Sequence, residues 1–121
     1  MAGVIATEQT NLAAVSLLSE ARFTKRICFS NPQVLVFVLT FAPGQELPKH
    51  RHPGSTLVVH VTGGSGVVVA DGRETPVAAG DILLVEGEEE FAVRNTGSEA
   101  LVLLASLSPN PSDPRYAQPV G

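Results

Sequence analysis

Short apolar runs, separated by turn-forming residues at intervals of about ten positions, constrain the fold of this chain more than any other feature of its sequence. Clusters of Gly, Pro, Asn, Asp and Ser end the runs, and Asp71-Gly72 is the strongest hairpin signal among them. No helical pattern interrupts the series, which argues against parallel βαβ units. The pattern therefore predicts an all-β sandwich or barrel.

The expected strands follow directly from the runs. They lie at 22–29, 34–42, 47–51, 56–62, 66–70, 74–78, 82–86, 90–95 and 100–107. The run from Val34 to Phe41 shows little polar alternation, which is typical of a strand buried on both faces.

Two flanking segments complete the predicted organisation. Residues 1–20 form an N-terminal arm, in which helical spacing from Leu12 to Leu18 predicts a short helix or helical turn that Asn11 could cap. Residues 21–108 form the barrel. Residues 109–121 form a Pro-rich, irregular tail, held only where Tyr116 finds a pocket or a neighbouring subunit.

Charge and cysteine content narrow the classes of function. The 8 basic and 12 acidic residues give a net charge of −4, which argues against nucleic acid or an anionic membrane as a partner. The single cysteine, Cys28, can form neither an internal disulfide nor a cysteine-based zinc site. The N-terminus shows no secretory pattern, so we expect a cytoplasmic protein.

The sequence His50-Arg51-His52 is the strongest candidate for chemistry. Side chains two residues apart in an extended segment point to the same face, so the two imidazoles could converge on one metal ion. Lys49 and Arg51 would then face the other way. The alternative is that both histidines are simply solvated in a turn.

The glycines and polar residues around this pair resemble the two sequence motifs of the cupins. Gly44, His50 and His52 match the first motif, and Gly80 and Asn95 match the ends of the second. The resemblance implies a small antiparallel jelly-roll barrel and a homodimer. It also implies a divalent metal ion (Fe, Mn, Ni or Zn) held by four protein ligands.

Two of those four ligand positions depart from the cupin pattern. Thr56 or Leu57 stands where the first motif has Glu, and Phe91 stands where the second has His. Phe91 either fills the space of a metal and its waters or stacks on a flat substrate. Thr56, Leu57 and Phe91 would thus belong to a pocket rather than to a metal site.

A third ligand could come from His60 or Glu89 instead. His60 faces the barrel interior if Thr56 is the equivalent of the Glu ligand. It faces outward if the apolar row Leu57, Val59 and Val61 faces in, which the alternation favours. Glu89 lies in an acidic loop that is more typical of a solvated segment.

Three functions follow from these features. The first is a small-molecule-binding cupin with a degenerate metal site. The second is a metal-dependent enzyme of the dioxygenase, isomerase or decarboxylase class that uses His50 and His52. The third is a regulatory or structural partner domain with an inert barrel. The fold alone does not choose among them.

Overall fold

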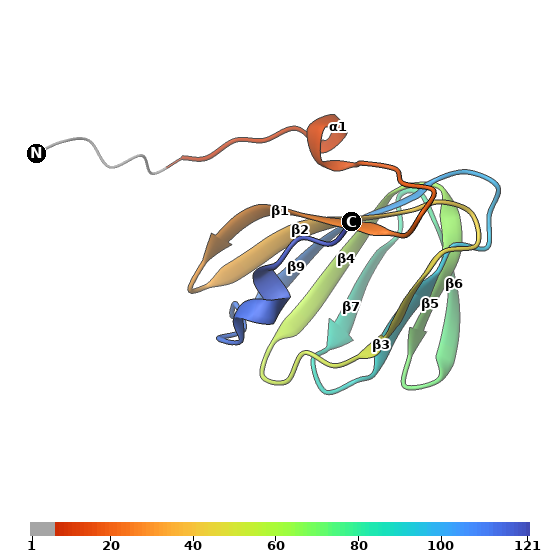
Figure 1. Cartoon of the computed structure of the whole chain (residues 1–121). Coiled ribbons are helices and arrows are strands. Elements are labelled where there is room, and N and C mark those ends of the chain that lie inside the picture. Colours follow the sequence, from red (N-terminus) through yellow and green to blue (C-terminus); the bar gives the residue numbers. More distant parts are fainter. Residues whose placement is uncertain (1–6) are drawn as a thin grey trace, which may run out of the picture.

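The computed structural model describes residues 7–121 and shows two antiparallel β-sheets that face one another (Figure 1). One sheet has the strand order β1-β2-β9-β4-β7 and the other β3-β8-β5-β6. The strands are β1 Thr24–Asn31, β2 Val34–Phe41, β3 Glu46–His50, β4 Thr56–Gly63, β5 Ser65–Ala70, β6 Arg73–Ala78, β7 Ile82–Glu86, β8 Phe91–Arg94 and β9 Leu101–Ser108. The all-β jelly-roll prediction is confirmed, and each predicted strand is present.

Alternating apolar residues place the core between the two sheets. In β9 every second residue from Leu101 to Leu107 is buried, and in β4 the buried residues are Leu57, Val59 and Val61. Strand β2 departs from this alternation because Val38 on its outer face is also fully buried. This agrees with the expectation of a strand buried on both faces.

The Asp71-Gly72 hairpin forms where the sequence places it. Strands β5 and β6 pair from Ser65↔Ala78 to Ala70↔Arg73, which leaves these two residues as the loop. Asp71 has φ 48° and Gly72 has φ 77°, the left-handed pair that a two-residue hairpin requires.

Asn95 of the second motif ties loops together at one end of the barrel. Its side chain is buried, donates to the carbonyl oxygens of Phe41 (2.9 Å) and Glu99 (2.8 Å), and accepts from the backbone N–H of Gly97. The Asn95 carbonyl in turn accepts from the N–H of Gly44. These motif residues therefore have a structural role.

The N-terminal helix is shorter than the periodicity predicts. Helix α1 spans Leu12–Val15, and the Asn11 side chain caps it by accepting from the N–H of Ala13 (2.9 Å). The first six residues of the predicted arm lie outside the described part. Between residues 7 and 121, no helix has the length and apolar character needed to cross a membrane.

The C-terminal tail is more ordered than its prolines suggest. A 3-10 helix, η1 (Pro114–Ala117), precedes Val120, which pairs with Lys25 of β1 through backbone hydrogen bonds of 2.9 and 3.1 Å. Arg26 donates to the backbone oxygens of Val120 (2.8 Å) and Gly121 (2.7 Å). The tail thus extends the edge of the larger sheet, where β1 would otherwise leave backbone groups unpaired.

Candidate functional site

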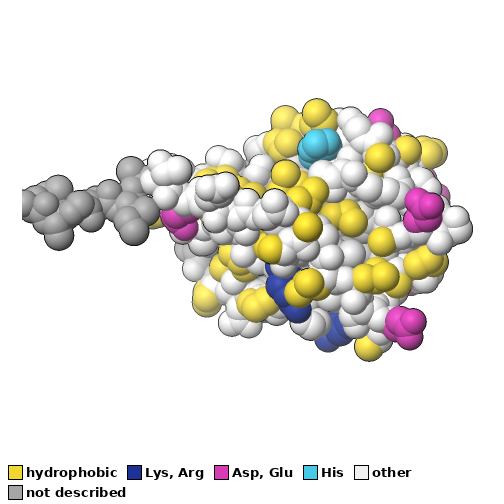
Figure 2. Space-filling model, turned by 90° about the horizontal axis from the view of Figure 1, so that it is seen from above, with side chains coloured by type: hydrophobic (Ala, Val, Ile, Leu, Met, Phe, Trp, Pro, Cys, Tyr) yellow, Lys and Arg dark blue, Asp and Glu magenta, His cyan; other side chains and the backbone are white. Residues whose placement is uncertain are grey.

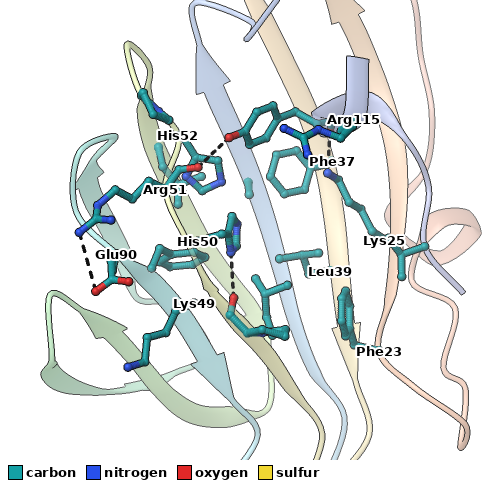
Figure 3. Close-up of a pocket in the computed structure, with 18 residues that line it drawn as sticks. Phe23, Lys25, Phe37, Leu39, Lys49, His50, Arg51, His52, Glu90 and Arg115 are labelled. Atoms are coloured by element: carbon teal, nitrogen blue, oxygen red, sulfur yellow. Dashed lines mark hydrogen bonds and ion pairs between the residues drawn. The ribbon is translucent and has the colours of Figure 1, made fainter. Parts of the chain in front are cut away.

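A pocket of about 690 Å³ opens between the two sheets, and the C-terminal tail forms part of its wall (Figure 3). Both sheets and the tail contribute side chains to it. They are Phe23, Lys25, Phe37, Leu39, Leu47, Pro48, Lys49, His50, Arg51, His52, Pro53, Leu57, Glu90, Phe91, Ala105, Arg115, Tyr116 and Val120.

The structure brings the two predicted histidines together in this pocket. His50 ends β3 opposite Phe91 of β8, and the chain then leaves the strand so that the N–H of His52 bonds the Gly87 carbonyl (2.8 Å). The imidazole centroids lie 4.5 Å apart with the rings nearly perpendicular. Arg51 points away toward Glu90, with 3.8 Å between their charged atoms (Figure 3).

Burial disfavours the protonated form of both imidazoles. The pKa of His52 is lowered to about 4, mainly by burial, then by repulsion from the His50 ring when that ring is protonated, and then by the charge of Lys25. Burial also lowers the pKa of His50, against the effect of a hydrogen bond to Pro48. Because a carbonyl oxygen only accepts, Nδ1 of His50 donates to Pro48 (2.9 Å), and its Nε2 is left as the acceptor.

Phe91 faces both imidazoles from the neighbouring strand. Its ring centroid lies 5.9 Å from that of His50 and 6.2 Å from that of His52, and its side chain is buried. An apolar ring therefore stands beside the pair at the place where the cupin pattern has a third imidazole.

The residues proposed as a third metal ligand lie elsewhere. Glu89 pairs with Arg73 (2.9 Å) and accepts from the N–H of Glu86 (3.1 Å). His60 is on the outer face of β4, as the apolar row predicts. From residue 7 onward, no three His, Cys, Asp or Glu side chains are grouped to hold a metal ion. Catalytic zinc sites use three protein ligands, so this donor set does not fit a metal centre.

The two candidates for the Glu position of the first motif fall on opposite faces of β4. Leu57 is buried and lines the pocket. Thr56 is half-buried, pairs with Glu86 of β7 and does not line the pocket. The expectation of Thr56 as a pocket residue is corrected for this reason, since successive side chains of a strand alternate between faces.

Sequence reasoning missed Lys25, which reaches the pocket from β1. Its Nζ donates to the carbonyl oxygen of Tyr116 and lies 4.7 Å from the ring centroid of Phe37. Burial lowers the pKa of Lys25. The signal was present in the sequence, because Phe23, Lys25 and Ile27 alternate along the same face of β1.

Tyr116 closes the pocket on the side of the tail. Its ring lies 5.5 Å from that of His52, and its hydroxyl donates to the carbonyl oxygen of Arg51 (2.8 Å). The tail is thus attached to the loop that carries the histidines. The sequence pointed to Tyr116 as an anchor, and the structure adds its place in the wall of the site.

Comparison with known proteins agrees with this fold. Residues 37–107 match the model of the cupin domain. Over 65 residues the chain is 32% identical to the oxalate-binding protein of Thermotoga maritima, covering 54% of each chain. It is 30% identical over 87 residues to auxin-binding protein 1 of Arabidopsis thaliana, covering 65% of this chain and 44% of that protein.

The chain thus spans about half the length of the curated relatives it matches. Among solved structures, TT1209 from Thermus thermophilus superposes with a TM-score of 0.81 at 25% identity, covering 87% of this chain and all of that one. The matched segment contains the histidine pair, Leu57 and Phe91. The chain belongs to the cupin-domain family.

Proposed function

We propose that this cupin binds a small molecule in the pocket beside His50 and His52, without a resident metal ion. The observation that carries the proposal is Phe91, which seals the place of a third ligand and leaves an apolar wall. The pocket volume of about 690 Å³ lies within the usual range for small-molecule sites, roughly 300–1,000 Å³. Two relatives are named for binding oxalate and auxin, which supports a binding role.

A metal-dependent enzyme is the alternative function, and a substitution at Phe91 tests it. We expect Phe91→His to give measurable Zn²⁺ or Ni²⁺ affinity, because a third imidazole would face the existing pair. Calorimetric titration and elemental analysis would measure the gain, with Phe91→Leu as the control that keeps the position apolar. Stoichiometric metal in wild-type protein, lost in a His50→Ala, His52→Ala double variant, would overturn the metal-free proposal.

Binding itself is tested by nuclear magnetic resonance in the presence of a chelator. The probes are benzoate, benzamide and benzylammonium, which share one ring and differ in charge. We expect at least one to shift the amide signals of Leu57, His52 and Phe91. If none of the three shifts these signals, or if shifts seen without the chelator vanish when it is added, the proposal is contradicted. The inert-barrel hypothesis then gains support.

The proposal extends to a homodimer, as the cupin resemblance implies. Ile82 and Leu84 of β7 and Val58 of β4 are exposed on the outer face of the larger sheet. Figure 2 shows hydrophobic side chains gathered around a histidine on the face seen from above, with acidic side chains toward the margins. Because each copy carries a net charge of −4, an apolar patch is where two copies can approach with least repulsion. The cytoplasmic location and the absence of nucleic-acid binding stay predictions.

A further inference from the structure

Lys25 is the one lysine that extends from β1 into the wall of the pocket (Figure 3). Arg51, Arg73, Arg94 and Arg115 each pair with a carboxylate within 4 Å. Lys25 has no such partner among residues 7–121. Its ammonium contacts the carbonyl oxygen of Tyr116 and the face of the Phe37 ring.

The ammonium group of Lys25 has hydrogen-bond donors and a charge that the protein only partly satisfies in this position. Lysine carries three N–H donors, and the Tyr116 carbonyl accepts one of them. Burial disfavours the charged form of Lys25, which is why its pKa is lowered. A partly buried charge is stabilised by an opposite charge beside it, and the described part of the chain supplies none here.

The charges around the pocket have the sign opposite to that of the whole chain. Lys25, Lys49, Arg51 and Arg115 are among its lining residues, and Glu90 is its single carboxylate among the described residues. Arg51 pairs with Glu90 and Arg115 with Asp113, which leaves the two lysines without a paired carboxylate in the described part of the chain. The chain as a whole has a net charge of −4. The unpaired charge at this opening is therefore positive, which favours the approach of anions.

The opposite wall supplies an acceptor and an apolar surface. Nε2 of His50 remains free to accept because Nδ1 donates to Pro48. Phe91 and Leu57 are buried and present carbon to the cavity. A molecule in the pocket thus meets a cation on one side, and a neutral imidazole and an aromatic ring on the other.

We propose that the ligand is a small organic acid, whose carboxylate pairs with the ammonium of Lys25 while its apolar body lies against Phe91 and Leu57. This inference rests on the proposed function and adds the chemical class of the ligand. It also assigns Lys25 as the residue that selects for negative charge. A cationic ligand would face Lys25 without a compensating carboxylate, since Glu90 faces Arg51.

The three ring compounds used above test the inference by their relative affinities. We expect benzoate to bind about tenfold more tightly than benzamide, and benzylammonium to bind least, because an ion-paired hydrogen bond adds about 1.5 kcal/mol or more. Lys25→Met should abolish the preference for benzoate. Lys25→Arg should retain it, which separates loss of charge from loss of packing around Phe37.

Arg94→Met is the matched control, because it removes one positive charge from a surface pair with Glu74 outside the pocket. It should leave the preference for benzoate unchanged. Equal binding of benzoate and benzamide, or a preference that survives Lys25→Met, would overturn the anionic ligand class while the binding proposal stands. Failure of all three compounds to bind would contradict the binding proposal itself.

Discussion

The two histidines of the pocket differ in their surroundings, and the difference bears on stability. His50 is half-buried and hydrogen-bonded to Pro48, whereas His52 is 3% exposed and packs between His50, Phe91 and Tyr116. Protonation of His52 would place a charge among two rings and a second imidazole. The folded protein therefore resists this protonation more strongly than the unfolded chain does.

The first prediction concerns stability in mild acid. The pKa of His52 is about 4 in the folded protein, against about 6.5 for an unperturbed histidine. Between these two pKa values the unfolded state binds more protons than the folded state. The contribution of His52 to the free energy of unfolding is therefore full above about pH 6.5 and is lost as the pH falls toward 4. We expect urea unfolding with a chelator to show about 1–2 kcal/mol less stability from this group at pH 5 than at pH 7.

His52→Gln should flatten this part of the pH dependence, because the amide does not titrate. His60→Gln, a substitution on the outer face of β4, is the control for replacing a histidine by glutamine outside the pocket. Identical pH dependence in wild type and His52→Gln would contradict the assignment to His52.

Whether a site residue could be predicted from the sequence depends on how far along the chain its partners lie. The pairing of His50 with His52 and the position of Phe91 were predictable, because each follows from motif spacing and strand alternation. The place of Lys25 in the pocket was not predictable, since its contact with Tyr116 joins residues 91 positions apart. The ion pair of the candidate ligand Glu89 was not predictable for the same reason. Its partner Arg73 comes from the hairpin of β5 and β6.

At the scale of elements, the loop between β7 and β8 supports the histidine segment. The Gly87 carbonyl accepts from the N–H of His52. A Cβ on Gly87 would overlap the carbonyl oxygens of Ser55 and His52. The absence of a side chain is what lets the two loops approach. The acidic loop thus has a positioning role in addition to keeping the surface hydrated.

Gly87→Ala should therefore destabilise the fold by about 1–3 kcal/mol, because backbone atoms cannot move aside as a flexible side chain can. It should also weaken binding in the pocket, since His52 would be displaced. Urea unfolding and the benzoate titration measure the two effects. Gly63→Ala is the matched control, because its Cβ would meet only Val102 at 3.9 Å. Equal stability of the two variants would contradict the close-approach argument.

Strand positions were predictable because the signals for them are local. A few neighbouring residues are enough to predict the Asp71-Gly72 turn and the alternating burial in β9. The order of the tail was harder to predict from the sequence, because it depends on hydrogen bonds to Lys25 and Arg26 of a distant strand. The helix ended early for a related reason. Little of the barrel packs against it to extend α1 beyond Val15.

At the scale of the whole molecule, the two faces of the larger sheet have different roles. The inner face closes the core, and the outer face leaves Ile82 and Leu84 at 70% and 62% exposure. Exposed apolar side chains of this kind, gathered on one face, are typical of contact surfaces between subunits.

Leu84→Lys tests whether this face joins two copies. We expect wild-type protein to have the mass of a dimer in light scattering coupled to size exclusion, and the variant to be monomeric, because each copy would bury a lysine. Thr75→Lys, on an exposed position of β6, also introduces a lysine but outside the face, and this variant should remain dimeric. A monomeric wild type, or a dimeric Leu84→Lys protein, would contradict the proposed homodimer.

The bridge between Val120 and Lys25 makes the pocket dependent on the last residues of the chain. Tyr116 and Val120 form one wall, so a molecule held there contacts a segment that is attached by a few hydrogen bonds. Occupancy and attachment of the tail are then thermodynamically linked. A ligand at a hundred times its dissociation constant would hold the tail in place by about 2.7 kcal/mol. The rate at which the ligand dissociates would in turn depend on the rate at which the tail detaches.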